Sequence, residues 1–490
     1  MNTELIVFIL YLIFMLGIGI YFYVKTRSGG EKEYFLGGRK MGPWVSALSA
    51  GASDMSAWVL MGLPGSIYFY GIGQTWIAIG LAIGYTLSWI FEAPRLRRYS
   101  IAAKDSITIP QYLTNRFLSQ SKAMQAICAV IFLVAYTIYA ASSISACGTL
   151  FERVVGIDSH TAMYLAAAVI VAYTFMGGFS AVCWTDFFQG MLMLGALLIA
   201  PIFALSLINA GDSTAAMAQA GSEGYWKLFT NWQDVLSGLG WGLGYFGMPH
   251  IIIRFMSVRS DKDIKKSAGI GVTWTLLILG FAVAAGIIGR MMGGQIVAAN
   301  ETEAETVFIQ MVRLIFPAVI SGVLLSAILA AAMSTADSQL LASASAFASD
   351  VYKPILRKGK AEDAEMFWIG RLVVLIVALA ALLIATDPNC GTIMGLVGKA
   401  WGVFGAAFGP VILLSLFWRR LTFKGAAAGI ITGAAVDILW IIFMSHTGLY
   451  EIIPGFIMGF AAALIFSWLD KAPDQEVTAL FDKVASKQEI

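Results

Sequence analysis

The sequence has few charged residues and very few residues that could hold a metal ion or a redox centre. Only 13% of its 490 residues are Asp, Glu, Lys or Arg, and it contains four cysteines and three histidines. The cysteines lack metal-ligand spacing and no Gly-x-x-x-x-Gly-Lys-[Ser/Thr] loop occurs, which argues against zinc sites, redox motifs and ATP-driven pumping by this chain alone. No nucleophile, base and metal ligand converge, and no loop is long enough for a catalytic domain. We therefore do not expect an enzyme, and the net charge of +2 gives no reason to expect a nucleic-acid partner.

Apolar residues, by contrast, make up 59% of the chain and gather in runs long enough to cross a bilayer. This composition is typical of an all-α polytopic membrane protein, because a helix satisfies its own backbone hydrogen bonds in lipid. Hydropathy predicts about thirteen spans. We divide the chain into residues 1–43 (the first span and a loop), 44–210 (spans two to six), 211–420 (spans seven to eleven) and 421–490 (the last two spans and a tail).

Lys and Arg gather in alternate loops, after spans one, three, seven, nine and eleven. Because short cytoplasmic loops retain basic residues, this alternation predicts a multi-pass protein of the plasma membrane with its N-terminus outside and its C-terminus in the cytoplasm. Arg116 and Arg254 are counted among these loop residues, and charge asymmetry alone also explains Arg39.

The apolar run from about Trp44 to Gly71 has a polar centre, Ser49-Ala-Gly-Ala-Ser-Asp-Met-Ser-Ala-Trp58. An ionised Asp54 in hydrocarbon would cost at least ~2.5 kcal/mol, so we expect it to face protein or water. Small residues around it favour an unwound backbone, which membrane proteins tolerate only where it lines a cavity. We interpret the run as a broken helix at a binding site. The alternative is a helix-packing face in which Asp54 pairs with a neighbour.

A second interrupted span, Gly240-Trp-Gly-Leu-Gly-Tyr-Phe-Gly-Met-Pro-His250, follows five spans later. Its glycines and Pro249 make a continuous helix costly, by roughly 1 kcal/mol per Gly and 3 for Pro. Two interrupted spans in corresponding positions indicate the binding site of a transporter. Because five is odd, spans two to six and seven to eleven would be inverted copies. The alternative is that the Gly-rich span simply packs tightly.

The ninth span carries Ser334, Asp337 and Ser338 at positions i, i+3 and i+4, and therefore on one helical face. By analogy with other hard cations, sodium takes hydroxyl, carboxylate and carbonyl oxygens as ligands. Hydroxyls in a membrane helix often bond back to their own carbonyls instead. The carboxylate beside them favours a cation site.

Several strings of residues are typical of one transporter family. Tyr173-Thr-Phe-Met-Gly-Gly178 and Trp184-Thr-Asp186 mark the wider family, while the segment from Gly240 to His250 and Leu449-Tyr-Glu-Ile-Ile-Pro-Gly-Phe456 are closer to one branch. By these strings the chain resembles the sodium/solute symporters, and among them the sodium/proline symporters, over nearly its whole length. The resemblance implies a leucine-transporter-type 5+5 inverted repeat, with one helix added before it and two after it.

The resemblance also implies the ions, the solute and the residues that bind them. A main sodium (Na+) site would be formed by the carbonyls of Ala52, Met55 and Ala331 and the hydroxyls of Ser334 and Thr335, with Asp54 as its organiser. A small zwitterion, proline in the first place, would lie against Ser56, Trp58, Tyr139, Trp241, Tyr245 and Pro249. Asp186, Asp337 and Ser338 would form a second cation site, unless Asp337 pairs with a basic residue such as Lys399.

Some residues depart from the pattern of the proline symporters. Met248 and Gln74 replace side chains common there, and Lys399 and Asp437 bring charges into spans eleven and twelve. The implied function is sodium-coupled uptake of L-proline by alternating access, and the alternative is symport of another amino acid, a monocarboxylate or a sugar. A channel or a membrane sensor is disfavoured, because symmetrical filter motifs and soluble signalling domains are absent from the sequence.

Overall fold

The computed structural model describes residues 2–26, 31–208 and 224–486, and almost all of this part of the chain is helical. Its β-structure is limited to one isolated bridge between Met41 and Val258. The all-α class expected from composition is therefore confirmed. The boundary that we place between residues 210 and 211 lies outside the described residues.

Within the described residues, ten helices are long and apolar enough to cross a membrane. They comprise α1 (Thr3–Thr26), α6 with α7 (Thr75–Leu87 and Ala93–Ala102, joined by the π-helical η3, Ser88–Glu92), α9 (Ala123–Val155), the part of α10 from Gly178 to Leu207, α14 (Asp261–Met291), α17 (Ala318–Phe347), α18 (Asp363–Ala385), α19 (Ile393–Phe417), α20 (Phe423–Phe443) and α21 (Ile452–Leu469). These helices form the frame that holds two interrupted segments.

The first interrupted segment consists of α3 (Pro43–Asp54), α4 (Ala57–Leu60) and α5 (Gly62–Tyr70). Helix α3 ends where Met55 leaves the helical region (φ −75°, ψ 71°), and Ser56 is extended. The Ser56 hydroxyl then accepts a hydrogen bond from the backbone N–H of Trp58 and begins α4, as an N-cap serine does. The predicted break beside Asp54 is confirmed.

The second interrupted segment consists of α12 (Trp232–Gly240), the 3-10 turn η4 (Trp241–Phe246) and α13 (Pro249–Ser257). Met248 is extended and Pro249 occupies the first turn of α13, where its missing N–H costs no hydrogen bond. Glycine allows η4 to approach its neighbours closely, because a Cβ on Gly244 would lie 2.0 Å from the indole nitrogen of Trp401. This predicted break is also confirmed.

Helix α10 (Ser159–Leu207) is interrupted at Gly178, whose φ of +59° and ψ of −176° suit glycine alone. A Cβ there would also lie 2.9 Å from a ring carbon of Tyr34. The kink separates the apolar stretch Ser159–Ala172 from the longer helix Gly178–Leu207. The last glycine of the Tyr-Thr-x-x-Gly-Gly string is therefore needed for the change of chain direction.

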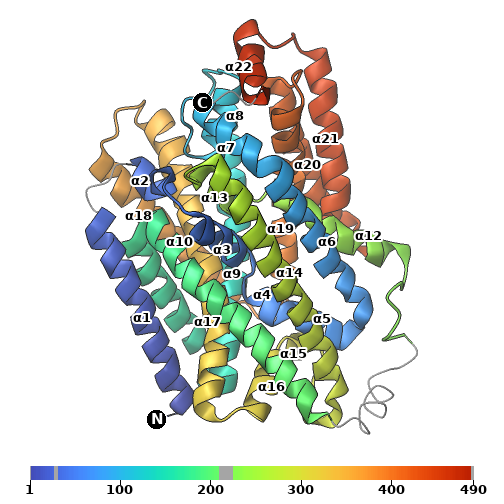
Figure 1. The fold of residues 1–490 in the computed structure, drawn as a ribbon. Helices are drawn as coiled ribbons and strands as arrows, with labels where there is room; N and C mark the ends of the chain where they lie inside the picture. Colours follow the sequence, from blue (N-terminus) through green and yellow to red (C-terminus); the bar gives the residue numbers. More distant parts are fainter. Residues whose placement is uncertain (1, 27–30, 209–223, 487–490) are drawn as a thin grey trace.

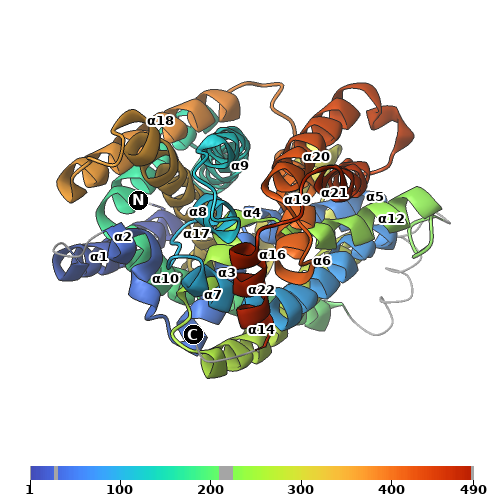
Figure 2. The same ribbon diagram turned by 90° about the horizontal axis from the view of Figure 1, so that it is seen from above.

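The two termini lie at opposite ends of the helix stack (Figure 1). The C-terminal end also carries α2 (Glu31–Leu36), α8 (Ile109–Arg116), α13 and α22 (Gln475–Ala485), whereas α15 (Glu301–Ala304) and α16 (Val307–Ile315) lie at the N-terminal end. Viewed from above, α3 and α17 lie near the centre, with α1 and α18 on one side and α20 and α21 on the other (Figure 2). Helix α17 packs against α9, α10 and α3, so most of its side chains face protein.

Three arginines that we counted among the loop residues have partners within the fold: Arg116 and Arg254 are buried, and Arg39 is partly buried. The guanidinium of Arg39 donates to Asp105 (2.9 Å), to the Ser100 hydroxyl (3.0 Å) and to the carbonyls of Met256 and Ser106. Arg116 has no exposed surface and donates to the Ser415 carbonyl at 3.1 Å. Arg254 lies within α13. Charge asymmetry alone therefore does not explain these three residues, because each also makes contacts within the fold.

Candidate functional site

Asp54 ends α3 at the first break and is fully buried. Its Oδ2 accepts a hydrogen bond from the Tyr245 hydroxyl at 2.5 Å, and its backbone carbonyl accepts from the Trp58 indole (3.1 Å) and the Tyr139 hydroxyl (3.4 Å). Tyr245 belongs to η4, so this carboxylate joins the two interrupted segments. The expectation that Asp54 points into the protein agrees with this geometry.

Aromatic rings form a continuous wall beside Asp54. Trp241 lies 6.3 Å from Trp58 and 5.0 Å from Tyr450 between ring centroids, the second pair nearly parallel at 25°. The Trp401 indole donates to the Trp241 carbonyl at 2.8 Å, which fixes η4 against α19. The structure thus brings together the rings that we expect to enclose the solute.

His250 contacts the end of α3 from the first turn of α13. Its Nε2 lies 3.1 Å from the Ser53 carbonyl, and its Nδ1 lies 3.3 Å from the Tyr136 hydroxyl. It follows Pro249, one of the residues expected to line the solute site, in the first turn of α13. The Pro-His dipeptide after a Gly-rich stretch is the signal that could have found it.

The oxygen atoms expected to bind sodium lie where α17 faces the end of α3. The Ser334 hydroxyl is 2.8 Å from the Ala52 carbonyl and 3.1 Å from the Ala331 carbonyl. The Thr335 hydroxyl is buried and has no hydrogen-bond partner among the described residues. Met55, at the break itself, completes the predicted set. An all-oxygen set with an unused hydroxyl fits a hard monovalent cation.

A second polar cluster lies one helical turn further along α17, around the guanidinium of Arg254. Its Nη2 is 2.6 Å from the Ser338 hydroxyl and 3.1 Å from Asp186 Oδ2, and its Nε is 3.1 Å from the Ser49 hydroxyl. Ser49 also donates to Asp186 Oδ2 at 2.6 Å. The cluster therefore joins α3, α10, α13 and α17.

The same cluster contains the other residue expected at a second cation site. The Ser338 hydroxyl lies 3.3 Å from Asp337 Oδ1. Lys399, the basic residue considered as a partner for Asp337, is an exposed residue of α19 whose charge acts on Glu451. Arg254 is the component that sequence reasoning missed, since a basic residue near a helix end is read first as a topology signal.

The hairpin α15–α16, at the N-terminal end of the helix stack, is attached to α19 by Glu305. Its carboxyl oxygens accept hydrogen bonds from the backbone N–H groups of Ile393 (3.0 Å) and Met394 (2.9 Å) at the start of that helix. Burial raises the pKa of Glu305 to about 7, although the two N–H groups favour the ionised form. This carboxyl therefore titrates close to neutral pH.

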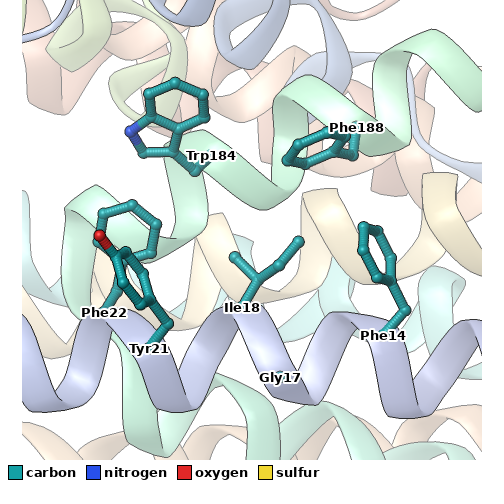
Figure 3. Close-up of a pocket in the computed structure, with 7 residues that line it drawn as sticks. All are labelled: Phe14, Gly17, Ile18, Tyr21, Phe22, Trp184 and Phe188. Carbon is teal, nitrogen blue, oxygen red and sulfur yellow. The ribbon is translucent and has the colours of Figure 1, made fainter.

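Two cavities lie outside the polar clusters around Ser334 and Arg254. An apolar groove of about 530 Å³ runs between α1 and α10, lined by Phe14, Gly17, Ile18, Tyr21, Phe22, Trp184 and Phe188 (Figure 3). It has no charged lining residue, so it does not suit a zwitterion. A second cavity, of about 310 Å³, is lined by Trp241, Tyr450 and Glu451 and by Asp234 of α12. It borders the aromatic wall.

The sequence pattern of the sodium:solute symporter family matches residues 34–433. The match covers most of the chain, and the chain belongs to this family. The resemblance seen in the motif strings is thereby confirmed.

Two curated relatives match over nearly the full length of the chain. The high-affinity proline transporter PutP of Bacillus subtilis (strain 168) is 44% identical over 470 residues, which cover 96% of this chain and 98% of that protein. The sodium/proline symporter of Escherichia coli (strain K12) is 44% identical over 485 residues, covering 98% and 96%. Both are transporters, which supports the expectation that the chain is not an enzyme.

Solved structures share the fold. The substrate-bound outward-open state of a Na+-coupled sialic acid symporter superposes with a TM-score of 0.80 at 21% identity, covering 97% of this chain and 99% of that chain. A nucleobase-cation-symport-1 family transporter in a closed conformation gives a TM-score of 0.56 at 15% identity, covering 92% and 98%. At these identities the likeness establishes the architecture alone.

Proposed function

We propose that this protein is a secondary active transporter that couples the inward movement of sodium to the uptake of L-proline by alternating access. The relatives with 44% identity are named for proline transport and sodium/proline symport. The observation that carries the proposal is the contact between Ser334 of α17 and the Ala52 carbonyl at the break of the first interrupted segment, 2.8 Å long. It gathers cation ligands directly beside the aromatic wall.

The proposed architecture has thirteen crossings and a 5+5 inverted repeat of leucine-transporter type. The ten long helices, the two interrupted segments and the stretch Ser159–Ala172 supply the crossings. Each proposed repeat begins with an interrupted segment and has short helices between its second and third crossings, α8 in one and α15 with α16 in the other. Termini at opposite ends suit an odd number of crossings (Figure 1).

In the proposed orientation the N-terminus is outside and the C-terminus is cytoplasmic. Lys262 begins α14 at the C-terminal end of the stack, and Thr302 lies in α15 at the other end. Cysteines introduced at these two positions should react with an impermeant maleimide from opposite sides of the membrane, Thr302→Cys from outside. The reverse labelling would overturn the orientation.

Sodium would bind to Ala52, Met55, Ala331, Ser334 and Thr335 in this proposal. Asp54 would organise the site, since it fixes the end of α3 through Tyr245 and Trp58. A cation placed there would be shared by α3 and α17. Binding would therefore hold the first interrupted segment against the helices that surround it, which is how an ion could bias one conformation over another.

The solute would bind between the two breaks, against Ser56, Trp58, Tyr139, Trp241, Tyr245 and Pro249. Short helices begin at both breaks, and their N-terminal ends favour the carboxylate of a zwitterion, while the rings accommodate an apolar body. All six residues are buried, Trp241 retaining only 7% exposure. Trp241 also lines the 310 Å³ cavity, whereas a solute could reach the other five residues only if one part of the molecule moves, as alternating access requires.

The cluster of Asp186, Asp337 and Ser338 is proposed as a second cation site, with the Arg254 guanidinium as its cation in this conformation. The 3.1 Å ion pair with Asp186 supports this assignment. Asp186 Oδ1 has no hydrogen-bond partner among the described residues, so a sodium ion is the competing occupant. An unchanged sodium Hill coefficient in Asp337→Asn would favour the guanidinium, and a reduced one would favour sodium.

Another small solute is the competing function, since Met248 and Gln74 depart from the proline symporters. Met248 directly precedes α13 and is buried, so it can influence the size of the solute site. Counterflow in proteoliposomes with labelled proline, other amino acids, a monocarboxylate and a sugar tests this, with and without a sodium gradient. Sodium-dependent exchange of proline above all other solutes is expected. Exchange of a different solute would overturn the assignment of proline.

A further inference from the structure

Asp437 is a buried acid that the proposed transport site does not use. It lies in the last turns of α20, has no exposed surface, and neither of its carboxyl oxygens has a hydrogen-bond partner among the described residues. Its neighbours on the packed helices are small: Gly402 of α19 and Gly455 of α21. An ionised carboxylate in such surroundings lacks the donors that would replace water.

A second acid faces the same space. A Cβ on Gly402 would lie 2.9 Å from Asp437 Oδ1 and 3.2 Å from Cγ of Glu451, so both side chains occupy the room that this glycine leaves. Glu451 precedes α21, is partly exposed, and lines the 310 Å³ cavity beside the aromatic wall. Asp437 therefore has a neighbour, Glu451, through which it can exchange a proton with water.

The remaining charged and titratable groups around Asp437 do not neutralise it. Helix α19 carries Lys399, whose charge acts on Glu451, and the chain between α20 and α21 carries the exposed His446. The Tyr450 hydroxyl donates to the Gly398 carbonyl at 2.7 Å. Tyr139 on α9 and Asp234 on α12 have other partners, the first the Asp54 carbonyl and the second Thr230 and Asn231.

The chemistry of this space suits a proton better than a metal ion. Sodium requires several oxygen ligands, whereas Gly402, Gly455 and Ala406 offer no hydroxyl group at this position. Two carboxylates that face each other repel, and one shared or bound proton removes the repulsion without further ligands.

We propose that Asp437 and Glu451 form a proton-binding site on the outer half of the molecule. Asp437 carries the proton in the packed arrangement seen here. On release, the O–H bond of the Asp437 carboxyl breaks, the Glu451 carboxylate accepts the proton, and Glu451 then passes it to water in the cavity. Because Tyr450 adjoins Glu451 and stacks on Trp241, the site links external pH to the aromatic wall.

Infrared difference spectroscopy of the full-length protein in lipid tests the proposal without relying on transport. The wild type should show the carbonyl stretch of protonated carboxyls at neutral pH, and Asp437→Asn should lack one component of this absorption. Glu305→Gln is a matched control, because it removes a different buried outer carboxyl. Identical carboxyl bands in the wild type and Asp437→Asn across the pH range would overturn the proposal.

Two further variants keep the test decisive. If Asp437→Asn does not fold, Glu451→Gln serves instead: it should retain the Asp437 band but slow its shift on transfer to heavy water. Sodium as the ligand is tested in Ser334→Ala/Thr335→Ala, which lacks the proposed main sodium site. Loss of the Asp437 band when sodium chloride replaces choline chloride at fixed pH would overturn the proton assignment.

The consequence for transport rests on the proposed function and is measured separately. Sodium-driven proline uptake should depend on external pH with a slope of at most about tenfold per pH unit, the limit for one proton. Asp437→Asn should flatten this slope, and Glu305→Gln should retain it. An unaltered slope in Asp437→Asn would contradict the link to transport. Absence of any proline uptake in the wild type would refute the proposed function and leave the infrared result valid.

Discussion

Two polar clusters lie one helical turn apart on α17, and they differ in one component. The Ser334 hydroxyl contacts carbonyl oxygens, that of Ala52 at 2.8 Å and that of Ala331 at 3.1 Å. Around Ser338 there is a guanidinium, with Arg254 Nη2 at 2.6 Å. Two serines on the same helix therefore differ in their surroundings. Ser334 faces a site that can accept a cation, whereas Ser338 faces the cationic side chain of Arg254.

The difference originates in α13, which faces both clusters. His250 and Arg254 lie at positions i and i+4 and so project from one face of that helix. His250 contacts the Ser53 carbonyl near the first cluster, and Arg254 contacts Ser49 and Ser338 at the second. The position of a cationic side chain on the opposite helix, not the hydroxyl itself, therefore distinguishes the two clusters.

The largest effect should come from removing the built-in cation. Arg254→Met leaves Asp186 buried without its ion pair, and loss of one partner of such a pair costs about 3–5 kcal/mol. Adding Asp186→Asn should recover a large part of this loss, since no uncompensated charge remains. The midpoint of thermal unfolding in detergent measures both changes.

The exposed ion pair between Arg419 and Asp482 is the control for that experiment. Both side chains are more than half exposed, and Arg419→Met should cost less than about 1 kcal/mol. Equal destabilisation by Arg254→Met and Arg419→Met would show that the cluster at Ser338 does not depend on its cation.

The second-largest effect should come from the cluster around Ser334 and Thr335. Ser334→Ala and Thr335→Ala each remove one proposed ligand of a charged ion, which is worth about 1.5–3 kcal/mol, or roughly 10- to 100-fold in sodium affinity. Ser338→Ala is the matched control, because its hydroxyl faces Arg254 and should leave sodium affinity almost unchanged. Sodium-dependent tryptophan fluorescence of purified protein measures the affinities. Wild-type affinity in both of the first two variants would place sodium elsewhere.

A smaller effect should separate the solute from the ion. Trp241→Ala removes a ring of the aromatic wall and should weaken proline binding by about tenfold or more while sparing sodium. Tyr245→Phe removes the hydroxyl that donates to Asp54 and should weaken both ligands, by roughly tenfold. Isothermal titration with each ligand alone measures the two affinities. Selective loss of proline binding in Tyr245→Phe would mean that Asp54 does not connect the solute site to the ion site.

The smallest effect concerns the hairpin α15–α16, at the N-terminal end of the helix stack. Since burial raises the pKa of Glu305 from 4.5 to about 7, the attached hairpin holds more protons than a detached one between these values. Attachment should therefore be strongest below pH 4.5, weaken as the pH rises to about 7, and change no further above it. Hydrogen exchange of residues 301–315, divided at each pH by the intrinsic exchange rate of an unfolded chain, should rise over this range by less than about tenfold, because local opening recovers only part of the burial cost. Glu305→Gln should show no such rise, and a rise that persists in this variant would exclude Glu305 as its cause.

Several features of the site could be predicted from the sequence because they depend on local chemistry. The breaks beside Asp54 and at Gly240 to Pro249 follow from residues that cannot continue a helix in lipid. Ser334 and Ser338 share a face because of helical periodicity alone. The contacts of Arg39, Arg116 and Arg254 within the fold could not be predicted, because a basic residue near the end of a span has the same pattern whether it faces water or other parts of the protein.

The sequence by itself determined that this chain is a helical membrane protein with two interrupted segments and a row of oxygen-bearing residues on one helix. Hydropathy, helix-breaking residues and periodicity act over a few neighbouring positions, so they are visible without a fold. Only the tertiary structure decided which distant groups meet: Tyr245 with Asp54, Arg254 with Asp186, and Asp437 with Glu451 across Gly402. These contacts depend on how helices far apart in the chain pack against one another. That packing determines whether a buried carboxylate is neutralised by an ion, by an arginine or by a proton.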